Sequence, residues 1–107
     1  MSYVSIIGDW DVTIKTPIGT LVTQYVFTQG PAGPVGTATH KDETVALQDI
    51  TTERVTEGLR VTWCQSVRKP MRLNLTFDVV CDGDTMTGYS RAGKLPRSAV
   101  TGRRRPQ

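Results

Sequence analysis

Three polar side chains of this chain could do chemistry together if folding encloses them. Asp49 is a carboxylate that one pairing of the chain places opposite Gln65, and Tyr25 carries a phenol that can donate a hydrogen bond to a ligand carbonyl. An Asp held between apolar walls has a raised pKa, which suits a general acid or base. The expected chemistry is proton transfer, with Asp49 as catalytic acid/base and Tyr25 as electrophile. The alternative is that Asp49 faces outward or simply pairs with Gln65 or Tyr25.

Other chemistries lack the residues they need. His40 is the only histidine, and no further histidine, cysteine or carboxylate joins it at a spacing typical of metal ligands. No nucleophile motif or dinucleotide fingerprint is present, and no helix that could hold a phosphate follows the glycine-rich segment 30–36. We therefore expect neither a metal nor a cofactor.

The elements that must position Asp49, Gln65 and Tyr25 are short strands. Runs rich in Val, Thr, Leu, Ile and aromatic residues alternate with turn signals, and no long window keeps a helical period. The pattern predicts one all-β domain over residues 1–107, an eight-stranded antiparallel up-and-down β-barrel. Residues 2–7 would close its N-terminal end and residues 104–107 would form a basic tail. The turn signals occupy 16–19, 30–36, 40–43, 56–58, 68–70, 82–84 and 91–96.

Strict alternation fixes which residues of each strand face the interior. Trp10, Val12 and Ile14 share one face, opposite a polar face, as in a half-buried strand. A two-residue turn at 17–18 would complete the first hairpin. The pairs expected there are Trp10 with Tyr25, Val12 with Thr23 and Ile14 with Leu21.

The later hairpins carry the residues with chemical interest. A three-residue loop at 68–70 would align two apolar faces and pair Trp63 with Leu75. A turn at Asp82-Gly83 would pair Val79 with Met86 and send Gly88 and Ser90 inward. A three-residue turn at 56–58 would pair Val55 with Leu59 and Asp49 with Gln65, although Ala46 and Ile50 form a rival apolar face on that strand.

The inward set contains more hydroxyl, amide and carboxylate groups than a sealed core can hold without partners. A cavity that contains water or a ligand would satisfy them, and an eight-stranded barrel is large enough for one small ligand. The alternative is a packed core. Besides Asp49 and Tyr25, the predicted ligand-binding residues are Trp10, Thr23, Phe27, Thr37, Trp63, Gln65, Leu75, Phe77, Met86 and Ser90.

Composition bounds the partners and the location. Apolar residues make up 37% of the chain, which suits strands with one apolar face, and the net charge of +3 comes largely from Arg103, Arg104 and Arg105. Such a run is typical of a solvated tail, so we expect no nucleic acid. No apolar run is long enough for a membrane span, and no secretion signal is present. Strand register separates Cys64 from Cys81, so both thiols should be free, as in the cytoplasm.

Two short motifs lie at the two ends of the chain, Gly8-Asp9-Trp10 in the first strand and Gly102-Arg103 in the last. Together they resemble the calycin superfamily, which contains lipocalins, fatty-acid-binding proteins and avidins. The resemblance implies a barrel in which Trp10 packs across the closed end and Arg103 lies over it.

Two further segments are similar to the avidin branch, namely TQGPAGPVGT at 28–37 and GLRVTW at 58–63. The resemblance does not extend to biotin, because Val12, Ala38 and His40 stand where avidins place three polar ligand-binding residues.

Three functions follow from these observations. The first is binding of a small, mostly apolar molecule inside the barrel. The second is a cofactor-free enzyme, such as an isomerase, cyclase or hydro-lyase, that uses an interior acid/base. The third is a structural module that self-associates, for example as a homodimer, through the outward Val22 and Val26.

Overall fold

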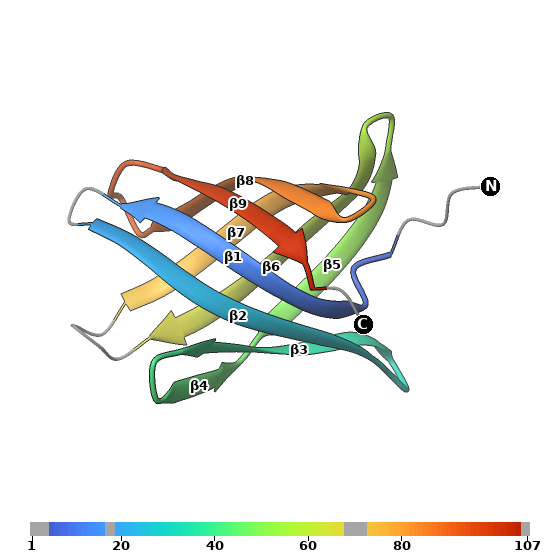
Figure 1. Ribbon diagram of the computed structural model, residues 1–107, viewed down its shortest axis with the longest axis horizontal. Helices are drawn as coiled ribbons and strands as arrows, with labels where there is room; N and C mark the ends of the chain where they lie inside the picture. The colour runs from blue at the N-terminus through green and yellow to red at the C-terminus, as the bar shows by residue number, and fades with distance from the viewer. Residues whose placement is uncertain (1–4, 17–18, 68–72, 106–107) are drawn as a thin grey trace.

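The chain forms one antiparallel up-and-down sheet that curls into a nearly closed barrel (Figure 1). This computed structural model describes residues 5–16, 19–67 and 73–105. The strand order is β4-β3-β2-β1-β9-β8-β7-β6-β5. The two edges of this sheet approach each other, since β4 contacts β6 and β3 contacts β5. The described residues form β1 (Gly8–Thr16), β2 (Gly19–Gly30), β3 (Gly33–His40), β4 (Glu43–Ala46), β5 (Gln48–Val55), β6 (Gly58–Val67), β7 (Leu73–Asp82), β8 (Thr85–Ala92) and β9 (Ser98–Arg104).

The described part of the chain has nine strands, not eight, because the segment predicted as the fourth strand divides at Leu47. The Leu47 N–H still donates to Gly36 O of β3 at 2.9 Å, and the chain then leaves β3 and pairs with β6. Asp49 has a φ of 55° and the pairing with β6 is irregular between Gln48 and Thr51. This bend lets one stretch of chain pair with both sides of the nearly closed barrel.

The first hairpin has the register predicted from its alternation. Trp10 pairs with Tyr25, Val12 with Thr23 and Ile14 with Leu21. The predicted turn at 17–18 lies outside the described residues. Strand alternation was sufficient to predict this register because apolar and polar residues alternate strictly along the first strand.

Two later hairpins are shifted from the prediction by two residues. Trp63 pairs with Phe77 instead of Leu75, and Val79 pairs with Gly88 instead of Met86. The predicted loop at 68–70 lies outside the described residues, and the β7–β8 turn is Gly83-Asp84 instead of Asp82-Gly83. A two-residue shift keeps each side chain on its predicted face, since the side-chain period of a strand is two.

The β5–β6 hairpin is shifted by one residue, and this reverses a face. Val55 pairs with Gly58 and not with Leu59, which leaves a two-residue turn in place of the predicted three. Gly58 has a φ of +149°, and a Cβ there would lie 2.1 Å from Cys81 O, so the hairpin needs glycine at this point. The prediction that Asp49 and Gln65 meet in the interior is therefore wrong: Asp49 is exposed.

Thr37 is a second residue whose predicted face is wrong. It pairs with the outward-facing Val26, whereas its neighbour Ala38 pairs with Tyr25 and is 3% exposed. The reason is that Thr37 and Ala38 both suit a half-buried strand, so composition alone leaves the register of β3 open.

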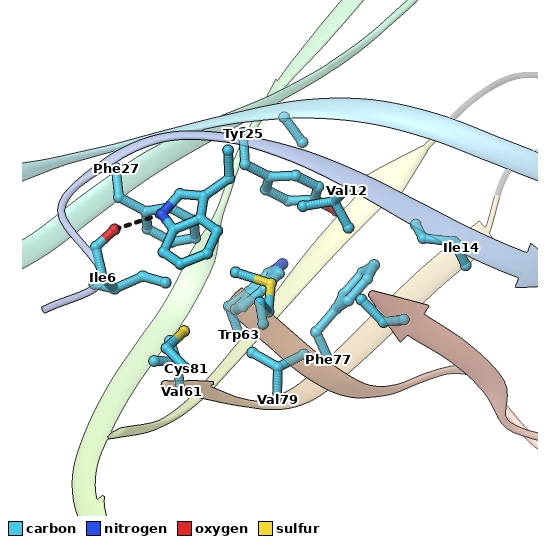
Figure 2. Packing of buried hydrophobic residues seen from close by; sticks show 14 residues of the cluster. Ile6, Val12, Ile14, Tyr25, Phe27, Val61, Trp63, Phe77, Val79 and Cys81 are labelled. Carbon is cyan, nitrogen blue, oxygen red and sulfur yellow. Dashed lines mark hydrogen bonds between the residues drawn. The ribbon is translucent and has the colours of Figure 1, made fainter. Parts of the chain in front are cut away.

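Aromatic rings fill the middle of the barrel (Figure 2). The rings of Trp63 and Phe77 stack at 4.8 Å between centroids, and Tyr25 lies 5.4 Å from Trp63. Phe27 extends the row on the β2 side, 6.1 Å from Tyr25. These side chains are at most 2% exposed, so the centre of the barrel is packed.

Candidate functional site

The centre of the barrel contains one shared hydrogen-bond acceptor. Gln65 Oε1 accepts from the Tyr25 hydroxyl at 2.7 Å and from Trp63 Nε1 at 3.0 Å, and both bonds are buried. Burial raises the pKa of Tyr25 well above its usual value. Tyr25 therefore stays protonated, and its hydroxyl donates the hydrogen bond to Gln65.

The other end of the Gln65 amide has no acceptor among the described residues. Gln65 Nε2 makes no hydrogen bond with a described residue, yet no fully buried polar side-chain atom of the described chain lacks a partner. Since Gln65 is 4% exposed, its NH₂ group retains a trace of solvent contact. The amide thus has two N–H donors without an acceptor in the described part of the chain.

We call this end the mouth; it is where β1, β6 and β8 end and β2, β7 and β9 begin, at the left of Figure 1. Three buried hydroxyl side chains face inward near it, Thr23, Ser90 and Ser98, and they make no hydrogen bond with another described side chain or backbone group. Half-buried Leu21 and Leu75 pack against the core at the same end. The mouth therefore combines apolar walls with several unoccupied polar groups.

Most of the predicted ligand-binding residues do share this interior. Leu75 is half-buried, and the two exceptions are Thr37 and Asp49, which lie on the outer surface. The buried ones are Trp10, Thr23, Tyr25, Phe27, Trp63, Gln65, Phe77, Met86 and Ser90.

The closed end of the barrel is covered by Arg104 and not by Arg103. The Arg104 guanidinium carbon lies 4.4 Å from the Trp10 ring centroid, and the Trp10 indole donates to Ile6 O at 2.9 Å (Figure 2). Arg104 also donates to the carbonyl oxygens of Ile7 and Ser5. The predicted tail beginning at residue 104 is wrong, because Arg104 is the last residue of β9.

Alternation along the last strand could have identified the correct arginine. Val100 is 1% exposed and faces inward, so Gly102 and Arg104 share its face, while Arg103 faces outward. The same reasoning finds Ser98, which faces inward at the mouth and was missed. Arg105 is also ordered by a contact, since its Nε donates to Asp11 Oδ1 at 3.0 Å.

The interior holds no described carboxylate. The buried polar residues are Thr23, Gln65, Ser90 and Ser98, all of them neutral. The proposed catalysis with Asp49 as interior acid/base is therefore wrong in its geometry. Within the described ranges no group of three metal-ligating side chains occurs, and His40 Nδ1 instead lies 2.9 Å from Val22 O.

The remaining side-chain predictions concern cysteines and surface valines. Cys64 and Cys81 are free thiols, as predicted, and burial raises the pKa of Cys81 to about 12. Val22 and Val26 face outward, as predicted, and are 60% and 40% exposed. No helix among the described residues is long and apolar enough to cross a membrane.

No family model, curated protein or solved structure matches this chain. Its function therefore has to be argued from the barrel itself.

Proposed function

We propose that the protein binds a small, mostly apolar molecule in the mouth of the barrel, as a calycin-like, lipocalin-like protein. The observation that carries the proposal is the Gln65 amide: its Oε1 is occupied by Tyr25 and Trp63, while its NH₂ group has no acceptor among the described residues. A buried donor that keeps a trace of solvent contact is suited to a ligand carbonyl or hydroxyl.

The surroundings of Gln65 specify the rest of the ligand. Leu21 and Leu75 provide apolar walls, and the hydroxyls of Thr23 and Ser90 supply a few further polar contacts. Such a mixture is typical of small-molecule sites, which are mostly apolar with a small number of placed polar groups. The two free thiols support a reducing location such as the cytoplasm.

Binding is favoured over catalysis because no ionisable side chain in the described interior titrates near neutral pH. Tyr25 is held protonated by burial, and Asp49 is outside. A ligand in the mouth would meet neutral hydrogen-bond donors and acceptors, which orient a molecule without transferring a proton.

The test uses prodan, a neutral fluorescent naphthalene with one ketone carbonyl. We expect its emission to shift to the blue on binding and the Gln65 side-chain NH₂ signals to move in ¹⁵N–¹H spectra of the wild-type protein. Ser98→Phe places a large ring at the proposed site and should weaken binding by about tenfold or more, since the added ring would compete with the ligand for the same position. Ala99→Phe is the matched control, because Ala99 is exposed on the outer surface.

Two results would overturn the proposal. One is saturable prodan binding with unchanged Gln65 NH₂ signals. The other is equal affinity of folded Ser98→Phe and Ala99→Phe proteins. The NMR measurement needs no variant, so it holds even if Ser98→Phe does not fold.

A further inference from the structure

Positive charge is concentrated at the end of this chain in a way that the net charge does not reveal. Residues 85–107 contain six of the 13 Lys and Arg residues and none of the 10 Asp and Glu residues. Arg104 and Arg105 have acidic partners, Asp84 and Asp11. The cations at the β8–β9 turn, Arg91, Lys94 and Arg97, form no ion pair with a described carboxylate.

Arg91 and Arg97 flank the turn between β8 and β9. The last printed pair of this hairpin is Ser90 with Ser98, and each arginine is the next residue toward the turn. Both are exposed on the outer surface. Two cations that lie close together at a turn repel each other, and a bound anion would reduce the repulsion.

The two arginines lie at one end of a groove on the outer surface of β5 to β8, with a volume of about 510 Å³. This volume falls within the range of small-molecule sites. The lining also includes Trp63, Phe77 and Ser90, which are buried, but the exposed side chains of the groove alternate with these and lie on the outer face of the sheet. Its outward-facing lining residues are Asp49, Thr51, Thr62, Cys64, Thr76, Asp78, Tyr89, Arg91 and Arg97.

An aromatic ring lies beside these cations. Tyr89 is 49% exposed, and the Arg97 guanidinium carbon lies 4.5 Å from its ring centroid. The Arg91 Nε donates to Leu95 O at 3.1 Å, which holds that side chain at the turn. A planar ring can stack on the exposed phenol or on the flat Arg97 guanidinium while its anionic group binds both arginines.

The acidic residues of the groove do not oppose an anion at this end. Arg60 donates to both carboxylate oxygens of Asp78, at 3.0 and 2.7 Å, and the positive charge of this ion pair offsets the charge of Asp78. Asp49 lies on β5, on the far side of the groove from Arg91 and Arg97. Its carboxylate can accept hydrogen bonds from the hydroxyl or amino groups of a ligand.

We propose that this groove is a second binding site, for a small planar molecule that bears a phosphate group, such as a nucleoside monophosphate. The phosphate binds Arg91 and Arg97, the ring lies against Tyr89, and hydrogen-bond donors at the other end reach Asp49. A longer nucleic acid is disfavoured, because Tyr89 is the only aromatic side chain that faces outward in the described groove.

Isothermal titration calorimetry at low ionic strength tests the site with three probes: adenosine 5′-monophosphate, adenosine and inorganic phosphate. We expect the nucleotide to bind, and adenosine and phosphate each to bind about tenfold more weakly or less, since each lacks one half of the contacts. Arg97→Gln should weaken nucleotide binding by about tenfold, because a hydrogen bond to a charged group is lost.

Arg103→Gln is the matched control, since it removes the same charge from an outward position of β9 that does not line the groove. Equal nucleotide affinity of the folded Arg97→Gln and Arg103→Gln proteins would refute the site. Nucleotide binding no tighter than that of phosphate would refute the role of the ring. A single-stranded oligonucleotide that binds more tightly than the nucleotide, per nucleotide, would replace the proposal with a nucleic-acid surface.

Discussion

Replacement of Gln65 by leucine is the sharpest test of how the barrel interior is held together. Gln65 Oε1 accepts from Tyr25 at 2.7 Å and from Trp63 at 3.0 Å, so Gln65→Leu leaves two buried donors without an acceptor. Each orphaned donor costs about 1–3 kcal/mol, so we expect the free energy of unfolding to fall by about 2–6 kcal/mol. That is a large share of the about 5–15 kcal/mol that stabilises a typical domain.

Urea denaturation followed by tryptophan fluorescence measures this loss. With a slope of about 1.5 kcal/mol per molar urea, a loss of about 3 kcal/mol lowers the midpoint by about 2 M. Adding Tyr25→Phe to Gln65→Leu removes one orphaned donor and should recover part of the loss, which is the signature of an unsatisfied group.

Gln24→Leu is the matched control, because it is the same substitution at an exposed position of β2. We expect it to move the midpoint little, as surface substitutions usually do. Equal midpoints for Gln65→Leu and Gln24→Leu would show that Gln65 is not the shared acceptor. A double variant weaker than Gln65→Leu would show that the Tyr25 hydroxyl has another partner.

Two further predictions concern the closed end of the barrel. Arg104→Gln should lower the free energy of unfolding by about 2–4 kcal/mol, because a mostly buried guanidinium loses its contacts with backbone carbonyls and with Trp10. Arg105→Gln breaks a half-exposed ion pair with Asp11 and should lower it by about 1 kcal/mol or less. Equal losses for the two variants would contradict this prediction. Burial raises the pKa of Cys81 from 9.0 to about 12, so the folded state holds this proton more tightly than the unfolded state and stability should be lost as the pH rises above 9.0. The free energy of unfolding, measured by urea denaturation, should therefore fall between about pH 8 and about pH 10 by up to about 1.4 kcal/mol more in the wild type than in Cys81→Ala. An equal fall in the two proteins would contradict the burial of the thiol.

The sequence predicts the inward-facing residues correctly where the predicted strand register is two residues from the observed one, and wrongly where it is one residue away. The hairpins around Phe77 and Gly88 were predicted two residues out of register, yet Trp63, Gln65 and Ser90 still face inward. Strand alternation reports a face and not a partner, so such shifts leave the core unchanged.

The β5 segment could not be predicted in the same way, because its sequence has no clean alternation. Ile50 and Val55 are half-buried among exposed neighbours, and a bulge near Asp49 changes which residues face inward. A bulge leaves no reliable mark in composition, and the turn length set by Gly58 depends on its close approach to Cys81 of another strand. Tertiary contacts therefore decided the position of the one carboxylate on which the catalytic hypothesis depended.

Because Asp49 lies on the outer surface, the described interior and the outer surface differ in their chemistry. The described interior carries only neutral polar side chains, and burial keeps Tyr25 and Cys81 protonated there. Charged groups lie outside, where Arg91 and Arg97 line the same groove beside the β8–β9 turn. Among the described residues, a charged molecule in the proposed mouth site would be desolvated without a counter-ion, whereas an anion in the proposed outer groove would have Arg91 and Arg97 as partners. The two proposed sites thus select different ligands, and prodan and adenosine 5′-monophosphate should bind without competing.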